Sequence, residues 1–529
     1  MLRNSLVIIL VLSLSACTQT IPTTEFVRRS IDELSIELEG SSANAFYDEV
    51  STAYSLFPIA FADGNGDKLG DLQGVIQKLD YLNDGDPMTT TDLGIDAVWF
   101  NPIYPTTTYH KYDITNYVDI DPKLGTLEDF KILVEEAHKR GIKIILDMVF
   151  NHTSSQHPWF LKALQKEEPY YDYYTIDTKI DLSQYPGQAG WQLKNGLTYY
   201  GGFWSEMPDL NMENEAVREE LRKVLDFWLD LGVDGFRYDA AKHVYDTNEY
   251  PSGTPLLQLN KQFWMEMKDY VKDRNPEAYL VGEVWLESSN AAPYASGFDS
   301  LFNFDVQGWI VSTVKNEYQN NFVSNVNSSL LKYNLKNDEF ITASFLSNHD
   351  QDRIMSQLSE SQNKMRLAAH ILFSMPGIPF VYYGEELGMT GRKPDEKIRE
   401  PFVWDLEDTT SNAMWEDWSY NSDTPSYAQQ VNNPESMWSM YRDLIAIRKA
   451  YPVFKEGALE AIDFNSNRIL GYLRSDTTTS IAVITNLGSK TEILELPFEA
   501  QILRNNQENI LSGKTLTLEP YGSVYLIVQ

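Results

Sequence analysis

Three acidic residues in this chain each follow a short apolar run that is typical of a β-strand. Asp239 ends the run GVDGFRYD, Glu283 follows YLVG, and Asp350 follows FLSNH. A parallel α/β barrel presents its catalytic groups at the C-terminal ends of its strands. Taken alone, each acid is typical of a carboxylate that caps the next helix. Three such blocks in order, with helical stretches between them, predict one carboxylate-lined site.

The segments around these acids alternate between strand-like and helix-like patterns. Amphipathic helices are predicted over 127–141, 214–231, 258–274 and 362–374. Strands are predicted over 53–61, 95–104, 142–152, 232–240, 278–285, 301–306, 340–348 and 378–383. Eight strands with interleaved helices predict an α/β fold of the (β/α)8 or TIM-barrel type.

Two further segments depart from this alternation. Residues 153–211 are rich in Tyr, Gly, Pro and Asp, have no regular period, and are too long for an ordinary connection. They predict an inserted subdomain after the third strand. Short β runs separated by turns predict a C-terminal antiparallel β-sandwich domain over 453–529. The barrel is then assigned to 46–152 and 212–452.

The N-terminus has the features of a bacterial export signal. Arg3 precedes an apolar run from Leu6 to Leu14, which is too short to span a bilayer and is typical of a signal peptide over 1–16. The following LSAC resembles the bacterial lipobox, so Cys17, the only cysteine in the chain, is predicted to carry lipid. With 17–45 as a polar tether, we expect an exported protein, lipid-anchored at the periplasmic or extracellular face of a bacterial membrane.

The composition limits the partners of the folded part. A net charge of −33, from 76 acidic and 43 basic residues, would repel nucleic acid and anionic membrane surfaces. A hydrophobic fraction of 43% is typical of a packed globular protein. We expect a neutral substrate, no nucleic-acid partner, and a monomer.

Five sequence blocks stand in order along the chain. They are DMVFNH (147–152), MPDLN (207–211), GFRYDAAKH (235–243), GEVW (282–285) and SNHD (347–350). With these blocks, the chain after residue 45 resembles the α-amylase family of glycoside hydrolases. The resemblance implies an α-glucan substrate, with Asp239 as nucleophile, Glu283 as general acid and base, and Asp350 as the residue that stabilises the transition state. Retaining cleavage uses such a pair of carboxyl groups about 5–5.5 Å apart.

The resemblance also implies a set of substrate-binding residues: His110, Tyr112, His152, Arg237, Lys242, His243 and His349. Tyr112 would stack on the sugar in the cleavage subsite, and Lys242 and His243 would line the leaving-group side. Arg237 precedes Asp239 by two residues on the same strand, so the two side chains share a face. A fixed guanidinium there would hold Asp239 ionised.

A loop near the start of the barrel has a spacing of oxygen ligands that suits Ca²⁺. Asp63, Asn65, Asp67 and Asp71 give the pattern D-x-N-x-D-x-x-x-D in DGNGDKLGDLQG. The loop is not an EF-hand, because Lys68 stands where glycine is expected. It matches a calcium loop after the first barrel strand of oligo-1,6-glucosidase-like members. The alternative interpretation is a polar turn held by its own side chains.

The resemblance also suggests a second calcium site. Asn151, Asp209 and His243 match three ligands of a site found in many α-amylases. The sequence does not place a fourth ligand.

The residues around the acids bear on which glycosidic bond is cleaved. MPDLN lies between the QPDLN of oligo-1,6-glucosidases and the MPKLN of neopullulanases, whereas typical α-amylases carry LPDLD-like forms. Tyr109 stands where exo-acting oligo-1,6-glucosidases have an aspartate. We therefore expect endo-cleavage of α-1,4 bonds in starch and maltooligosaccharides, with retention. The alternatives are neopullulanase, cyclomaltodextrinase or 4-α-glucanotransferase activity. A glucan-binding lipoprotein without catalysis is disfavoured, because all three acids are present.

Overall fold

The computed structural model describes residues 45–177 and 190–529. The predicted signal peptide, Cys17 and all of the tether before Ala45 lie outside the described residues, and so do residues 178–189 of the predicted insert. Within the described ranges, none of the helices combines the length and the hydropathy needed to cross a bilayer.

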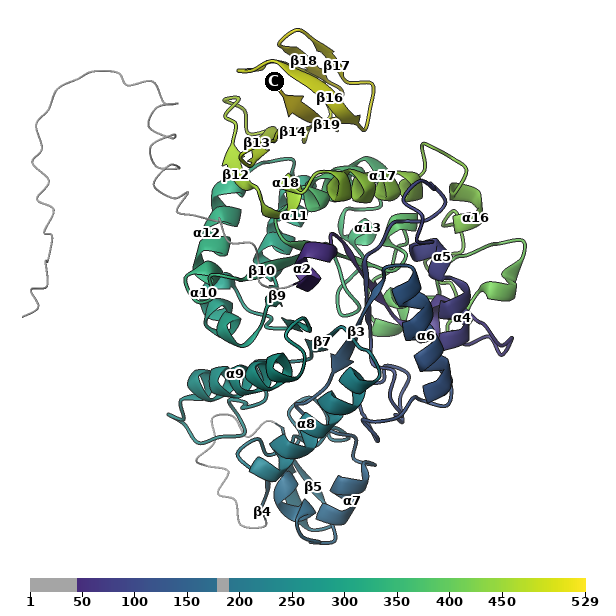
Figure 1. The fold of residues 1–529 in the computed structure, drawn as a ribbon, viewed down its shortest axis with the longest axis vertical. Coiled ribbons are helices and arrows are strands. Elements are labelled where there is room, and N and C mark those ends of the chain that lie inside the picture. Colours follow the sequence, from purple (N-terminus) through teal and green to yellow (C-terminus); the bar gives the residue numbers. More distant parts are fainter. Residues whose placement is uncertain (1–44, 178–189) are drawn as a thin grey trace, which may run out of the picture. The chain divides into compact units, whose positions relative to one another are not determined.

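Eight parallel strands close into a barrel, which confirms the predicted fold class (Figure 1). They are β1 (Ala53–Leu56), β2 (Ala97–Phe100), β3 (Lys143–Met148), β7 (Gly235–Tyr238), β8 (Tyr279–Gly282), β9 (Ser300–Phe302), β10 (Ile341–Phe345) and β11 (Ile378–Tyr382). Each strand pairs with its neighbours in this order, and β1 pairs with both β2 and β11 to close the ring.

The barrel strands are buried on both faces, which explains their almost continuous apolar sequences. A short helix, α2 (Ala45–Glu49), packs against one end of the barrel. The ring of Phe46 stacks on Tyr279, the first residue of β8, with ring centroids 4.4 Å apart. Helix α2 therefore covers the N-terminal end of the strands and leaves the C-terminal end to the acidic residues.

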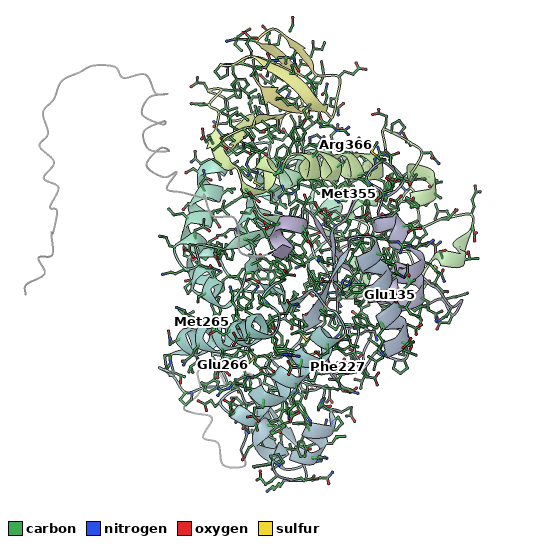
Figure 2. The ribbon with its side chains drawn as sticks, in the orientation of Figure 1. Glu135, Phe227, Met265, Glu266, Met355 and Arg366 are labelled. Atoms are coloured by element: carbon green, nitrogen blue, oxygen red, sulfur yellow. The ribbon has the colours of Figure 1, made fainter. Side chains whose placement is uncertain are left out.

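The helices of the barrel bury one apolar stripe each. In α8 (Glu215–Asp230) the buried positions include Val217, Leu221 and Trp228, which recur at helical spacing. The side chain of Asn214 accepts from the backbone N–H of Ala216 and caps the helix. The polar side chains of these helices face outward. One of them is the exposed Glu135 on α6 (Leu127–Lys139), which is labelled in Figure 2.

The other helices that accompany the barrel are α3 (Pro58–Phe61), α4 (Leu72–Gln77), α5 (Leu79–Leu82), α6 (Leu127–Lys139), α9 (Leu256–Arg274), α10 (Ser288–Ala291), α11 (Phe304–Asn316), α12 (Phe322–Asn334), α13 (Ile354–Gln357), α14 (Gln362–Phe373), α15 (Asp395–Ile398), α16 (Tyr427–Gln430), α17 (Met437–Ala450) and α18 (Val453–Glu456). Short 3-10 turns occupy Ala292–Gly297, Glu385–Leu387 and Thr409–Ser411.

The segment between β3 and α8 forms a small unit of its own. It contains α7 (Pro158–Ala163), a 3-10 turn over Tyr170–Tyr173, and a three-stranded antiparallel sheet. The strands of this sheet are β4 (Ile176–Asp177), β5 (Trp191–Lys194) and β6 (Leu197–Tyr200) (Figure 1). An isolated bridge between His152 and Asp209 ties its end back to the residues after β3.

The C-terminal part consists of two antiparallel sheets that enclose an apolar core. One sheet has the order β12-β13-β14-β19-β16 and the other β15-β18-β17. The strands are β12 (Ala458–Ala461), β13 (Ile469–Ser475), β14 (Ser480–Asn486), β15 (Glu492–Glu495), β16 (Ala500–Asn505), β17 (Ile510–Ser512), β18 (Thr515–Leu518) and β19 (Ser523–Val528). The hydroxyl of Tyr472 lies 2.6 Å from the Ser374 hydroxyl after α14, which connects these sheets to the barrel.

All eight predicted strands are shorter in the structure, and in two of them the remaining residues begin a helix. The strand predicted over 53–61 ends at Leu56, because Pro58 cannot donate to a ladder and instead begins α3. The strand predicted over 301–306 ends at Phe302. There the side chain of Asn303 accepts from the backbone N–H of Val306 and starts α11.

Candidate active site

The three predicted catalytic acids follow the C-terminal ends of three different strands and line one cleft. Asp239 follows β7, Glu283 follows β8, and Asp350 lies on the segment after β10. The cleft has a volume of about 550 Å³. Its other lining residues are His110, Tyr112, His152, Phe203, Trp204, Met207, Ala240, Lys242, His243, Trp285, Asp395 and Arg399.

Arg237 lies beneath the acids and holds three carboxylates with one guanidinium. Its Nη1 lies 2.6 Å from Oδ1 of Asp239 and 2.8 Å from Oδ1 of Asp147, and its Nη2 lies 2.9 Å from Oε2 of Glu283. Arg237 is almost fully buried. Alternate residues of a strand share a face, so β7 points Arg237 and Asp239 toward the same centre. The neighbouring strand β3 supplies Asp147 in register with Arg237.

Three carboxylates against one guanidinium leave this centre rich in negative charge. Burial raises the pKa of Glu283, Arg237 lowers that pKa, and the charges of Asp239 and Asp350 raise it again, so the net shift is upward. Burial also raises the pKa of Asp239, and Arg237 lowers it by less, so the net shift is upward and the expectation that Arg237 alone holds Asp239 ionised is not met. The backbone N–H of Ala240 donates to Oε2 of Glu283 over 3.0 Å, which fixes its carboxyl group. The arrangement gives Glu283 a raised pKa, which suits a group that donates a proton.

Asp350 has a different electrostatic environment. Its Oδ2 lies 3.0 Å from Nε2 of His349, and its Oδ1 lies 3.0 Å from Nη2 of Arg399. Burial raises the pKa of Asp350, but the contacts with His349 and Arg399 lower it by more, so its pKa lies below the usual range. Asp350 is therefore held ionised.

A hydrogen-bonded group forms the floor of the cleft. The Tyr112 hydroxyl lies 3.0 Å from Oδ2 of Asp147 and 2.7 Å from Nε2 of His349, and its ring stacks on the His349 ring. Nδ1 of His110 accepts from the backbone N–H of Tyr112, and Nε2 of His152 lies 3.2 Å from the Tyr112 carbonyl oxygen. Burial lowers the pKa of His152 to about 4, so this histidine is neutral.

The side of the cleft next to Glu283 is polar and aromatic. Nζ of Lys242 lies 3.5 Å from the carbonyl oxygen of Trp285, and Nδ1 of His243 is hydrogen-bonded to Asp246. The Trp285 ring is 44% exposed and stacks on Phe304, with ring centroids 4.8 Å apart. Two further exposed rings, Phe203 and Trp204, line the same cleft.

The structure brings all ten predicted catalytic and substrate-binding residues into this region. Eight of them line the cleft, and Arg237 and His349 lie directly beneath it in contact with the acids. Sequence reasoning missed Asp147 and Arg399. Asp147 had a usable signal, because it is an acid inside the buried third predicted strand, at the start of DMVFNH. Arg399 had none, since it follows the last barrel strand at no recognisable spacing from the acids.

The predicted calcium ligands lie on the loop between α3 and α4. Carboxylate oxygens of Asp63, Asp67 and Asp71 all lie within 4.8 Å of one another. Asp71 also caps α4, because its Oδ1 accepts from the backbone N–H of Gly74. The Asn65 amide oxygen accepts from the backbone N–H of Asp67 and supports the turn. Within the described ranges, no lysine or arginine forms an ion pair with these three carboxylates, so a divalent cation fits the donor set.

Two of the three residues of the suggested second calcium site lie in direct contact. Nδ2 of Asn151 donates to Oδ2 of Asp209 over 2.9 Å, and the buried amide oxygen of Asn151 has no hydrogen-bond partner among the described residues. The His243 side chain is instead hydrogen-bonded to Asp246. Burial raises the pKa of Asp209 to about 7.

Comparisons with known proteins agree with this geometry. Residues 55–457 match the family model of the α-amylase catalytic domain. The chain is 39% identical over 480 residues to Alpha-amylase 3 of Dictyoglomus thermophilum, covering 89% of this chain and 92% of that protein. It is 31% identical over 454 residues to a 4-alpha-glucanotransferase of Thermotoga maritima, covering 84% of this chain and 97% of that protein.

A solved structure extends the likeness to three dimensions. The crystal structure of an α-amylase from H. orenii superimposes with a TM-score of 0.83 at 38% sequence identity, covering 90% of this chain and 99% of that one. A closed barrel with acids at its strand ends, a family match over most of its length and relatives of this identity lead to one conclusion. The chain belongs to the α-amylase family of glycoside hydrolases, and it is a glycosidase.

Proposed function

We propose that this protein cleaves internal α-1,4 bonds of starch and maltooligosaccharides with retention at the anomeric carbon. The observation that carries the proposal is the sharing of one guanidinium by Asp239 and Glu283 at the floor of an open cleft. Carboxyl groups bound to the two terminal nitrogens of one arginine fit the separation of about 5–5.5 Å used by retaining enzymes. That spacing leaves no room for the water that an inverting enzyme places between its acids.

Each acid then has a separate role. Asp239 attacks the anomeric carbon while Glu283 gives its proton to the departing glycosidic oxygen, which forms a covalent glycosyl-enzyme. Glu283, now ionised, takes a proton from water as that water attacks the same carbon and releases Asp239. Asp350 binds hydroxyls of the reacting sugar, and its negative charge favours the cationic ring of the transition state.

Support for internal cleavage comes from Tyr109. Its ring stacks on Trp415, with centroids 4.9 Å apart at 21°, and it packs beside Arg399. Position 109 itself carries this aromatic ring and not a carboxylate, although Asp395 lies on the same side of the cleft. A glucan can therefore extend past the reacting sugar, as endo-cleavage requires.

A second activity, 4-α-glucanotransfer, has a specific observation in its favour. Trp285, Phe203 and Trp204 expose large rings to the cleft, and Trp285 lies two residues after the proton-shuttling Glu283. Aromatic rings stack on the apolar faces of sugars. They would hold an incoming acceptor where a leaving group had been, and one relative bears the name of this activity.

We further propose Ca²⁺ as a structural ion at Asp63, Asp67 and Asp71, with Asn65 supporting the turn. The convergence of three carboxylates without a protein cation supports this assignment. When bound, the ion would supply positive charge that ties the loop to the start of α4. The predicted chemistry of Asp239 and Glu283 does not use it.

We also propose that the chain is exported and anchored through lipid on Cys17, at the periplasmic or extracellular face of a bacterial membrane. The support is the LSAC block after an apolar run of signal-peptide length. In a bacterial host, Cys17→Ala is expected to move the protein from the membrane fraction to the soluble fraction. Retention of the variant in the membrane would contradict the assignment.

The test of the main proposal is a time course of products from soluble starch and from maltotriose. Endo-hydrolysis predicts a rapid fall in chain length with mixed short oligomers, released first as α-anomers. Asp239→Asn serves as the blank and should release nothing. Glucose alone, released stepwise from chain ends, would sink the proposal, and oligomers longer than maltotriose would assign transfer instead.

A further inference from the structure

Arg399 is a buried arginine in the cleft that no motif identified. It follows α15, on the segment after the last barrel strand, and its side chain is only 3% exposed. Nε donates to the carbonyl oxygen of His349 over 2.8 Å, and Nη2 donates to Oδ1 of Asp350 over 3.0 Å. One guanidinium thus holds both the backbone and the carboxylate of the two residues that end SNHD.

Arg399 itself is fixed from several sides. Nη2 also lies 3.2 Å from Oδ2 of Asp395, one helical turn earlier. The guanidinium packs over the rings of Phe57 and Tyr109, and the backbone carbonyl of Arg399 accepts from Nε1 of Trp415. A guanidinium immobilised in this way can impose its geometry on Asp350 instead of following it.

The other partner of Asp350 supplies a hydrogen bond and not a full charge. Nδ2 of Asn101 lies 3.1 Å from Nδ1 of His349. An amide NH2 only donates, so Nδ1 of His349 accepts this bond, and Nε2 of His349 carries the proton that faces Asp350. Burial lowers the pKa of His349, which keeps the ring neutral. Among the described residues, Arg399 is therefore the one permanent cation in contact with Asp350.

The remaining charged or titratable groups that face Asp350 come from five other parts of the barrel. They are Arg237 on β7 and Asp239 directly after it, Glu283 after β8, His110 and Tyr112 after β2, Tyr382 on β11, and Asp395 on α15. Arg237 is already bound to three other carboxylates. It cannot replace Arg399 as the partner of Asp350.

We propose that Arg399 is a positioning residue, which fixes the orientation of Asp350 and keeps it ionised while the reacting sugar binds. The proposal rests on the assignment of Asp350 to the transition state. Through Asp350, Arg399 also acts on Glu283, whose proton is held in part by the negative charge of Asp350. Arg399, which lies outside the sequence blocks, thereby influences the pKa of both Asp350 and Glu283.

The test compares Arg399→Gln, Arg399→Lys and the wild type. Arg399→Gln should lower kcat roughly 10- to 100-fold, because Asp350 loses its fixed geometry. It should also weaken inhibition by 1-deoxynojirimycin, a cationic mimic of the reacting sugar, roughly tenfold more than it raises KM, because Asp350 is no longer aimed at the charged ring. Arg399→Lys should restore only part of both losses, because lysine keeps the charge and loses the fork.

The ratio of the inhibition constant to KM does not depend on how much of a variant is folded. Arg392→Gln is the matched control, on the same segment but half-exposed and 3.7 Å from Asp352, and it should leave kcat and this ratio unchanged. A ratio that stays unchanged in Arg399→Gln would overturn the inference. The proposed α-1,4 endo-activity is judged separately from the wild-type products, and this test applies to whichever α-glucan the wild type turns over.

Discussion

Two clusters of carboxylates lie on segments that follow barrel strands, and they balance their charge in opposite ways. In the cleft, Arg237 contacts Asp147, Asp239 and Glu283, and a second arginine contacts Asp350. The guanidiniums fix each carboxylate at a set distance. This cluster is complete without any added ion.

The loop over 63–71 has no such partner. Among the described residues, its three converging carboxylates form no ion pair with lysine or arginine. These carboxylates instead accept hydrogen bonds from backbone N–H groups, such as those of Gly66 and Lys68, which donate to Asp63. The comparison shows that the carboxylates of the cleft are oriented by arginines, whereas the converging carboxylates of the loop have only backbone partners among the described residues.

Neutralising one acid in each cluster should affect catalysis in the cleft and stability in the loop, and the larger effect is expected in the cleft. Asp239→Asn should reduce kcat on starch by roughly 10⁴-fold or more, because the amide cannot form the glycosyl-enzyme. Its melting temperature should be unchanged or higher, since a buried negative charge is removed. Initial rates and thermal unfolding on the same samples measure both, and a rate within tenfold of the wild type would remove Asp239 from the role of nucleophile.

Within the cleft, the role of Glu283 as proton donor can be distinguished from that of Asp239 as nucleophile. Glu283→Gln should lower turnover of starch roughly 10²- to 10⁴-fold, because the leaving oxygen is no longer protonated. Turnover of a maltosyl fluoride should fall far less in its first step, since fluoride departs without a proton. Pre-steady-state release of fluoride provides the measurement. Equal losses on the two substrates would contradict the assignment of Glu283 as the acid.

Removal of calcium from the loop cluster should lower the stability of the fold and leave catalysis in the cleft almost unchanged. At a calcium concentration of 100 Kd, the bound ion stabilises the fold by about 2.7 kcal/mol, so chelation should lower the melting temperature by a few °C. Asp63→Asn should reproduce that loss and make the protein insensitive to the chelator. Initial rates at 25 °C should change little.

The matched control for the loop is Asp86→Asn. Asp86 accepts from the backbone N–H of Met88 in an exposed polar turn, and it is not part of a converging group. Its variant should melt like the wild type and keep the response to the chelator. If Asp63→Asn and Asp86→Asn behaved alike, the alternative of a polar turn without an ion would be the better description of the loop.

Sequence reasoning predicted the barrel and its acids because both depend on local patterns. Buried parallel strands are continuous apolar runs, and a carboxylate after such a run must lie at the C-terminal end of the barrel. The strand over 301–306 was partly wrong because a single side chain, Asn303, begins a helix within an apolar run. Burial cannot distinguish strand from helix over so few residues.

What the sequence could not predict were the contacts made across the barrel. Arg399 lies 49 positions after Asp350, and only the closure of the barrel brings the two together. The same holds for Trp285 and Phe203, which come from different segments to line one cleft. The partner of a charge is a property of the tertiary fold, so the groups that raise or lower the pKa of each acid became clear only in the structure.

A third kind of carboxylate gives the smallest expected effect. Glu385 is buried and accepts a hydrogen bond from the Tyr441 hydroxyl over 2.9 Å, with no ion pair among the described residues. Burial raises the pKa of Glu385 from 4.5 to about 8. The unfolded chain loses this proton above pH 4.5 and the native state keeps it to about pH 8, so this group lowers stability as pH rises through that window.

Glu385→Gln mimics the protonated side chain and escapes this loss. Its melting temperature should exceed that of the wild type by a few °C at pH 9, and the difference should shrink toward pH 5. Glu407→Gln, at an exposed position, is the control and should show no such pH dependence. A Glu385→Gln variant that is less stable than the wild type at pH 9 would mean that the native pKa of Glu385 is not raised by burial. Arg353, the nearest cation that lowers its pKa, would then be its partner, as arginines are in the cleft.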